Sequence, residues 1–488
     1  MTGKQVLVTG ATGYIASRLI PQLLQRGYRL RCMVRKPHVL RGRPWFGQVE
    51  VVAGDVLDPA SLRPVLEGVS TAYYLIHNMA SGRGYTGREL DGARNFAAEA
   101  EAAGVEHVIY LGGLADSRSH IAAHLRSRIE TGEILQAGKV PVTEFRAGVI
   151  VGPGSISFEM LRFMTEFFPI VPGPVWVKNL SQPIAAQNVF DYLLAALDNP
   201  AGQGKVFEIG GPQVMRYSEL MLEYARLRGL RRRMITFPYI PLWFMSFGIG
   251  LISPVPARIA YALIDGLRSD SRVQELAARQ VFSDVKLIPY DEAVRSSLRR
   301  LDPGQLEPVW MDRDQPAVNI KHEGFFISHR LLHVEATPED VFRVLGGLGR
   351  EGDWLHASWL WRLRGWIDQL FSPSYLQRAA QGTPNRQVSD GPFLNTGDRL
   401  SYYRIEAIEL GRRLLLKSEL KAPGEGWIEW RMEPEEDGGT MLAQTGFFAP
   451  RGLPGFLYWY LLYPFHEFVF RGLIRAIARK AERKIQHG

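Results

Sequence analysis

The stretch VLVTGATGYIASRL, residues 6–19, constrains the fold of this chain more than any other feature. It joins a strand-like apolar run to a helical pattern through a turn that contains Gly10 and Gly13. Gly10 permits the tight turn, Gly13 lets a backbone approach a pyrophosphate, and Ala16 permits close packing of helix on strand. The amides at the start of such a helix attract phosphates. The stretch therefore predicts a dinucleotide site between the first strand and the first helix.

Apolar runs and helical patterns continue to alternate as far as about residue 150. The predicted strands read QVLVTG, LRCMVR, VEVVAGD, TAYYLIH, HVIYLGG and VTEFRAGVIVG, and the helical stretches include ELDGARNFAAEAEAAG and HLRSRIETGEILQAG. Alternation at this spacing predicts an α/β Rossmann fold, a doubly wound parallel sheet with helices on both faces. Ligands of such sheets bind at the carboxyl ends of the strands.

The pattern changes after residue 300, so two domains are expected. Residues 1–300 form the Rossmann domain with a helical segment on the substrate side, and residues 301–321 read as a linker rich in Pro, Asp and Gln. Residues 322–488 form an α+β domain, in which antiparallel strands follow a helix capped by Thr337 and precede one long C-terminal helix.

The residues after the second and third strands indicate which dinucleotide binds. NAD-selective sites place an acidic residue at the end of the second strand, whereas NADP sites carry a basic residue for the 2′-phosphate. This strand ends in Arg35 and Lys36 with no acid beside them, so NADP (NADPH) is the expected cofactor and NAD the alternative. Two solvated surface bases without a ligand are the other interpretation. Asp55 and Val56 follow the third strand and are expected to reach the adenine.

The amino-acid composition limits the classes of ligand and partner that this chain is expected to bind. The net charge of +8 is scattered rather than gathered in a basic stripe, which argues against nucleic acid and favours an anionic ligand or an anionic membrane surface. Cys32 is the single cysteine, so we expect no internal disulfide and no cysteine-based metal site, and we assign no metal ligand. No signal peptide is expected before the first strand, and the predicted location is the cytoplasm or the inner membrane face.

Residues 234–257 contain no charged residue, but four prolines interrupt them. About a dozen uninterrupted apolar positions are left, fewer than the ~20 that a membrane-spanning helix needs. A buried or pocket-capping helix is the favoured interpretation, contact with a membrane surface is the second, and a span is the third.

Several motifs together resemble the short-chain dehydrogenase/reductase superfamily: TGATGYIASRL, VRKP, AGDVLD, the Arg-Ala-Gly-x-x-x-Gly-Pro-Gly of residues 146–154, and VFEIGGPQVMRYSEL. Residues 1–300 are similar to its atypical or extended branch, which includes NmrA-like proteins and an accessory subunit of mitochondrial complex I. The two-domain layout resembles bacterial proteins of the YbjT type. The layout of residues 322–488 resembles the START-like helix-grip fold, whose sheet encloses an apolar cavity.

Aromatic residues of the second domain leave three interpretations open: an ordinary core, a cavity for a lipophilic ligand, or contact with a membrane or partner. They are Trp354, Trp359, Trp361, Trp366, Tyr458, Trp459, Tyr460, Phe465, Phe468 and Phe470.

Motif chemistry and the resemblance together predict the residues that contact the cofactor. They are Gly10, Thr12, Gly13, Tyr14, Ile15, Arg35, Lys36, Asp55, Val56, Leu75, His77, Gly112 and Arg128. His77 follows the fourth strand, where a catalytic role and a packed or surface histidine are both open interpretations.

The resemblance also implies a catalytic Tyr-x-x-x-Lys, which this chain lacks. The Tyr position falls on His124, the Lys position on Arg128, and the upstream Ser on Gly112 or Gly113. Arg128 can still donate hydrogen bonds to ribose hydroxyls. His124 can act as a general acid, although a cation one turn away lowers its pKa. The candidates for replacing the missing hydroxyl are Ser117, Ser119 and His120.

Three functional hypotheses follow. The first is an NADP(H)-dependent oxidoreductase acting on an unidentified hydrophobic substrate, with His124 and Arg128 as altered catalytic residues. The second is a non-catalytic NADPH-binding sensor or scaffold, in which the same two residues only hold the cofactor. The third is a nucleotide-sugar epimerase or dehydratase, which is weakened because those chemistries also use the absent Tyr. The sequence assigns no oligomeric state.

Overall fold

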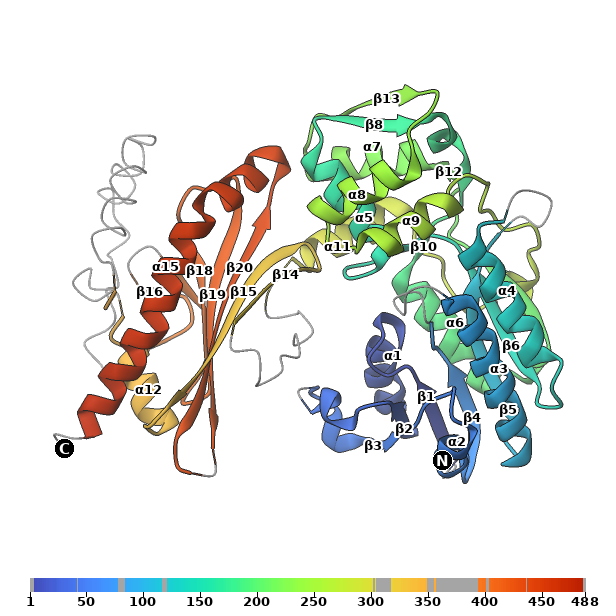
Figure 1. Ribbon diagram of the computed structural model, residues 1–488, viewed down its shortest axis with the longest axis horizontal. Coiled ribbons are helices and arrows are strands. Elements are labelled where there is room, and N and C mark those ends of the chain that lie inside the picture. Colours follow the sequence, from blue (N-terminus) through green and yellow to red (C-terminus); the bar gives the residue numbers. More distant parts are fainter. Residues whose placement is uncertain are drawn as a thin grey trace. The chain divides into compact units, whose positions relative to one another are not determined.

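The computed structural model describes residues 4–41, 43–77, 84–115, 121–301, 303, 317–348, 355–356, 394–400, 403–435 and 437–485. The chain divides near residue 300 into two compact units (Figure 1). The predicted linker lies largely outside the described residues, as do Ser117, Ser119 and His120 and the four early tryptophans of the second domain.

The first unit is built on a seven-stranded parallel sheet with the order β11-β6-β5-β4-β1-β2-β3 (Figure 1). Its strands are β1 (Gln5–Thr9), β2 (Arg29–Val34), β3 (Glu50–Ala53), β4 (Val69–Tyr74), β5 (His107–Gly113), β6 (Val142–Ala147) and β11 (Val206–Ile209). β1 pairs with β2 on one side and with β4 on the other. The strand order therefore reverses between β1 and β4, which is where open α/β sheets bind ligands. The predicted Rossmann fold is confirmed.

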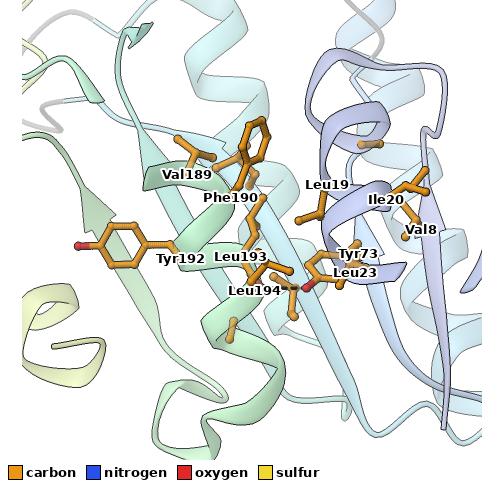
Figure 2. Close-up of a cluster of buried hydrophobic side chains, with 14 of the residues drawn as sticks. Val8, Leu19, Ile20, Leu23, Tyr73, Val189, Phe190, Tyr192, Leu193 and Leu194 are labelled. Atoms are coloured by element: carbon orange, nitrogen blue, oxygen red, sulfur yellow. Dashed lines mark hydrogen bonds between the residues drawn. The ribbon is translucent and has the colours of Figure 1, made fainter. Parts of the chain in front are cut away.

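Helices cover both faces of this sheet. On one face α1 (Tyr14–Gln25) and α6 (Ala186–Asp198) enclose a core that Figure 2 shows, with Leu19 and Leu23 approaching Leu193. The hydroxyl of Tyr73 on β4 donates a 2.8 Å hydrogen bond to the backbone oxygen of Leu193. On the other face lie α2 (Pro59–Leu66), α3 (Tyr85–Ala102) and α4 (Ala123–Gln136). Because both faces are buried, the strands read as nearly continuous apolar runs rather than alternating ones.

The predicted sixth strand is in fact two strands. Residues 142–147 form β6 in the large sheet, whereas β7 (Ile150–Val151) leaves it and pairs with β10 (Ile184–Ala185). The seventh strand of the sheet is β11, which the sequence did not predict as a strand because it is only four residues long and includes Glu208.

Residues 150–299 add helices and short two-stranded sheets to the first unit. The helices are α5 (Ile156–Phe167), α7 (Tyr217–Arg228), α8 (Leu242–Ile252), α9 (Ala257–Gly266), α10 (Ala277–Val281) and α11 (Tyr290–Arg299). β9 (Leu180–Ser181) pairs with β12 (Met215–Arg216), and β8 (Ile170–Pro174) pairs with β13 (Arg233–Phe237).

The uncharged segment 234–257 forms most of β13 and the eleven-residue helix α8. Among the described residues, every helix is too short or too polar to cross a lipid bilayer. The transmembrane interpretation of this segment is therefore wrong.

The second unit is a separate antiparallel sheet with the order β14-β15-β20-β19-β18-β17-β16. Its strands are β14 (Ala317–His322), β15 (Phe325–Val334), β16 (Arg399–Leu400), β17 (Tyr403–Glu409), β18 (Arg413–Ser418), β19 (Gly424–Pro434) and β20 (Thr440–Pro450). Residues 317–321 were predicted as linker but belong to β14, where each pairs with a residue of β15. These residues form a strand because they pair with β15 along its length, and a local sequence pattern does not reveal such pairing.

In the described part of this unit, α12 (Pro338–Leu345) and α15 (Gly452–Ile485) accompany the sheet. The hydroxyl of Thr337 accepts a hydrogen bond from the amide of Asp340, which confirms the predicted N-cap. Trp459 of α15 stacks on Phe326 with ring centroids 5.3 Å apart, so it is an ordinary core residue. The arrangement is compatible with the START-like fold, and a ligand cavity in it stays a prediction.

Candidate functional site

A cleft of about 1120 Å³ follows the carboxyl ends of β1 to β5. Every residue predicted to bind the cofactor lines it: Gly10, Thr12, Gly13, Tyr14, Ile15, Arg35, Lys36, Asp55, Val56, Leu75, His77, Gly112 and Arg128. His124 lines it as well. The fold therefore brings together residues that the sequence spreads over more than a hundred positions.

The glycine turn has the geometry that a phosphate cradle requires. Gly10 has φ +65°, and a Cβ there would lie 2.8 Å from the backbone oxygen of Leu75, so only glycine fits. Gly13 is the N-cap residue of α1, and its amide donates a 2.8 Å hydrogen bond to the backbone oxygen of Gly10. The hydroxyl of Thr9 donates to Tyr73 and accepts from Leu75, which ties the ends of β1 and β4 together. These residues fit a dinucleotide pyrophosphate.

Basic side chains stand at one side of this cleft. Arg35 and Lys36 are both exposed, and within the described residues neither forms an ion pair. The carboxylate of Asp55 accepts from the amide of Leu57 at 3.0 Å, which fixes its position at the end of β3. Arg88, in the first turn of α3, also lines the cleft. Sequence reasoning missed Arg88 because nothing in its local pattern distinguishes it from a solvated helix residue.

A buried carboxylate organises the far side of the cleft. Glu89 on α3 is 1% exposed, and its Oε1 lies 2.8 Å from Nδ1 of His77. Its Oε2 accepts from the hydroxyl of Ser127 at 2.6 Å. Burial raises the pKa of Glu89, but hydrogen bonds and charges from His77, Ser127 and Arg128 more than offset this, so the pKa is lowered overall. Sequence reasoning missed Glu89 because residues 77 and 89 meet only through the packing of α3.

Arg128 is held against the sheet by two backbone contacts. Its guanidinium donates from Nη2 to the backbone oxygen of Leu111, and its own backbone oxygen accepts from the hydroxyl of Tyr110 at 2.9 Å. The side chain reaches the cleft lining from this position. A permanently charged fork of N–H donors placed there can bind ribose hydroxyls.

His124 lies at the border between the cleft and a second, apolar cavity. Its side chain is buried, and Nδ1 has no hydrogen-bond partner among the residues that the structure describes. Burial, with smaller contributions from the charges of His77 and Arg128, lowers the pKa of His124 to about 4. The sequence correctly predicted a lowered pKa for His124, but burial of the imidazole, rather than the neighbouring cation, is the main cause. The imidazole is therefore neutral at pH 7.

A side chain at the end of β5 would displace the ends of two neighbouring side chains. A Cβ at Gly112 would lie 2.9 Å from Oε1 of Glu144, and one at Gly113 would lie 2.8 Å from Cδ2 of Leu125. Instead, Ser157 in the first turn of α5 lines both the cleft and the apolar cavity. The sequence offered no signal for Ser157, because its role depends on how α5 packs.

The apolar cavity, of about 150 Å³, adjoins the cleft within the first unit. Residues that line both spaces form the shared wall: His124, Leu125, Ala147, Gly148, Ser157 and Leu263. The rest of its lining is mainly aliphatic, methionine and aromatic side chains, including Met160, Met164, Trp176, Met221, Met245 and Ile249. The pocket-capping interpretation of segment 234–257 therefore fits α8, which contributes Met245 and Ile249.

Two segments of the chain match known families. Residues 10–139 match a family described as NAD(P)H-binding, and residues 326–473 match a family of proteins of unknown function, DUF2867. The chain is 25% identical over 313 residues to the mitochondrial NADH dehydrogenase (ubiquinone) 1 alpha subcomplex subunit 9 of Arabidopsis thaliana, covering 59% of this chain and 75% of that protein.

Two reductases are also similar. Ceramide reductase of Caulobacter vibrioides is 28% identical over 171 residues, which cover 34% of this chain and 53% of the reductase. The structure of triphenylmethane reductase from Citrobacter sp. superimposes with a TM-score of 0.50 at 20% identity, covering 60% of this chain and 99% of the reductase, and so shares its fold. The first unit of this chain therefore contains an NAD(P)H-binding domain, and the second unit contains the segment that matches the DUF2867 family.

Proposed function

We propose that this protein is an NADPH-dependent reductase of a hydrophobic carbonyl or alkene substrate. The observation that carries the proposal is the wall that the dinucleotide cleft shares with the apolar cavity. NADPH bound in the cleft would supply a hydride at its nicotinamide. A substrate in the cavity would then lie next to the reacting ring, screened from water by aliphatic and methionine side chains.

The preference for NADPH over NADH rests on Arg35 and Lys36. Both line the cleft after β2, where a 2′-phosphate would bind, and Asp55 after β3 is positioned on the adenine side. Arg128 would hold the nicotinamide ribose through its fixed guanidinium.

We assign the proton exchange with the substrate to His77, which lines the cleft. An ionised carboxylate only accepts hydrogen bonds, so Nδ1 of His77 donates to Glu89 and Nε2 is left for proton exchange. For a carbonyl substrate, Nε2 of the protonated imidazole would give its proton to the substrate oxygen, which would leave a neutral His77 and an alcohol. His124, which is neutral and lies on the shared wall, would orient the carbonyl as a hydrogen-bond partner.

A lipid-like substrate class fits the cavity lining. Ceramide reductase, one of the similar proteins, is named for a reaction on a lipid. We therefore expect long-chain or alicyclic ketones and enones to be better substrates than nucleotide sugars, whose hydroxyl groups would find few partners among the apolar side chains.

The test is NADPH oxidation, followed at 340 nm, across such ketones and enones with the full-length protein. Replacing Met160 by Trp fills the cavity, so it should raise KM at least tenfold while the affinity for NADPH stays unchanged. Leu222→Trp, on the partly exposed surface of α7, is the matched control and should change neither. Oxidation of none of the compounds despite tight NADPH binding would contradict the proposal.

That outcome would favour the second candidate, a sensor or scaffold in which NADPH is held without turnover. The observation behind this alternative is that β5 ends in Gly112 and Gly113, which carry no hydroxyl. Calorimetry should show NADPH binding for both candidates, and the oxidation assay at 340 nm separates them because only the reductase consumes NADPH.

A further inference from the structure

Helix α8 is apolar on two opposite faces, and only one of them is covered. On its inner face Met245 and Ile249 line the apolar cavity. On its outer face Trp243, Phe247 and Leu251 are 67%, 63% and 66% exposed. Large apolar side chains in a row seldom face water, and a helix that is apolar all round is normally buried on both sides. The exposed apolar side chains of the outer face therefore indicate a surface that contacts another apolar surface.

Further exposed aromatic residues continue this surface. Phe244 lies on α8 itself, and Tyr239 precedes the helix with the side chain 78% exposed. Trp and Tyr are the residues that settle at the boundary between lipid headgroups and acyl chains, because each combines an apolar ring with one polar group.

The segment of the sequence that contains α8 carries charge of one sign. Residues 231–264 contain four arginines and no acidic residue. Arg232 is committed to backbone oxygens of Thr165 and Glu166, but Arg231, Arg233 and Arg258 are exposed and form no ion pair within the described residues. A basic margin around an apolar surface complements an anionic lipid headgroup layer.

We propose that the outer face of α8 docks this protein on an anionic lipid surface. The helix has eleven residues, too few to cross a bilayer, so it would lie in the interface with its rings in the acyl boundary. The same helix would then separate the lipid from the cavity. A lipid-soluble substrate could enter past α8 without crossing water, and this last step rests on the proposed function.

The experiment measures binding of the full-length protein to vesicles, without cofactor or substrate. Sedimentation is compared for vesicles of phosphatidylcholine alone and for vesicles that contain one-third phosphatidylglycerol. We expect binding to the anionic vesicles, weakened by salt because the arginines contribute through screened charge. Trp243→Ser and Phe247→Ser should each weaken binding about tenfold, since each removes one buried ring. Arg231→Gln combined with Arg258→Gln should abolish the preference for anionic vesicles.

Matched controls come from exposed residues elsewhere. Leu410→Ser, at a 65% exposed leucine of the second unit, and Arg300→Gln should leave binding unchanged. Wild-type protein that stays in the supernatant would overturn the proposal, and so would equal binding by the α8 variants. A dimer in ultracentrifugation that Phe247→Ser converts to a monomer, without vesicle binding by the wild type, would assign this face to a second copy instead. None of these outcomes depends on turnover, so the docking and the reductase proposals fail separately.

Discussion

Glu89 and His77 are joined by a 2.8 Å hydrogen bond between Oε1 and Nδ1, although one comes from the second turn of α3 and the other follows β4. The carboxylate is almost completely buried, whereas a quarter of the imidazole side chain is exposed. The pair thus places a fixed charge behind a ring that lines the cleft, and it determines which nitrogen of His77 is available for proton exchange.

Replacing Glu89 by Gln should lower kcat for reduction about a hundredfold, because the imidazolium loses the charge that stabilises it. Burial and Arg128 already lower the pKa of His77, and the carboxylate opposes them. Reduction by the wild type should therefore speed up as the pH falls below 6.5, and the variant should need a still lower pH. The pH profile of kcat/KM measures this shift.

Ser127→Ala is the control, because it removes a hydrogen bond from Glu89 without touching His77. It should reduce stability by about 1 kcal/mol and leave the pH profile in place. An identical profile for Glu89→Gln and the wild type would show that His77 is not the proton donor.

Gly10→Ala should destabilise the first unit by about 3 kcal/mol and abolish NADPH binding. Its φ of +65° and the 2.8 Å approach to Leu75 leave no room for a methyl group. Gly27→Ala has a similar φ of +81° but nothing within 4 Å, so it should cost only about 1 kcal/mol and keep the cofactor. Denaturant unfolding and calorimetry compare the two, and equal costs would refute the steric argument.

Arg35→Ser combined with Lys36→Ser should weaken NADPH binding by about 10- to 100-fold and change NADH binding little. The two charges pair with a phosphate that NADH lacks. Titration calorimetry with both coenzymes measures the ratio of affinities. Arg299→Ser with Lys205→Ser, outside the cleft lining, serves as the charge-matched control. A ratio that does not change would mean that the two bases are only solvated.

The first unit should lose stability between pH 6.5 and pH 4. Burial lowers the pKa of His107 to about 4, as it does for His124. Below about pH 6.5 these two histidines bind protons in the unfolded chain but stay neutral in the folded chain. Their full contribution to the free energy of unfolding is therefore present above about pH 6.5, and each contribution falls by up to about 1.4 kcal/mol per pH unit as the pH is lowered toward 4.

Urea unfolding at pH 7.5 and pH 5.0 checks this dependence. His107→Asn should reduce the difference between the two pH values by about 2 kcal/mol, since it removes one of the groups that titrate only in the unfolded chain. His38→Asn, at an exposed position, should leave the difference as it is. The same difference in all three proteins would exclude the assigned role of His107.

The cofactor side of the cleft could be predicted from local sequence because each element of it is local. Gly10 and Gly13 belong to one strand–turn–helix stretch, and Arg35 and Asp55 follow consecutive strands whose carboxyl ends must meet at one edge. The substrate side could not be predicted in this way. Glu89, Ser157 and the methionines of the cavity come from separate helices whose packing depends on the whole first unit.

By itself the sequence determined the Rossmann pattern, the glycine turn and the bases that follow β2, because hydrogen bonding within a turn and alternation of elements act over short stretches of chain. Only the tertiary structure decided that His77 is backed by a buried carboxylate, that His124 is neutral on a shared wall, and that α8 keeps one apolar face outside. Burial and charge–charge contact depend on which distant segments pack together, and a linear pattern does not contain that information.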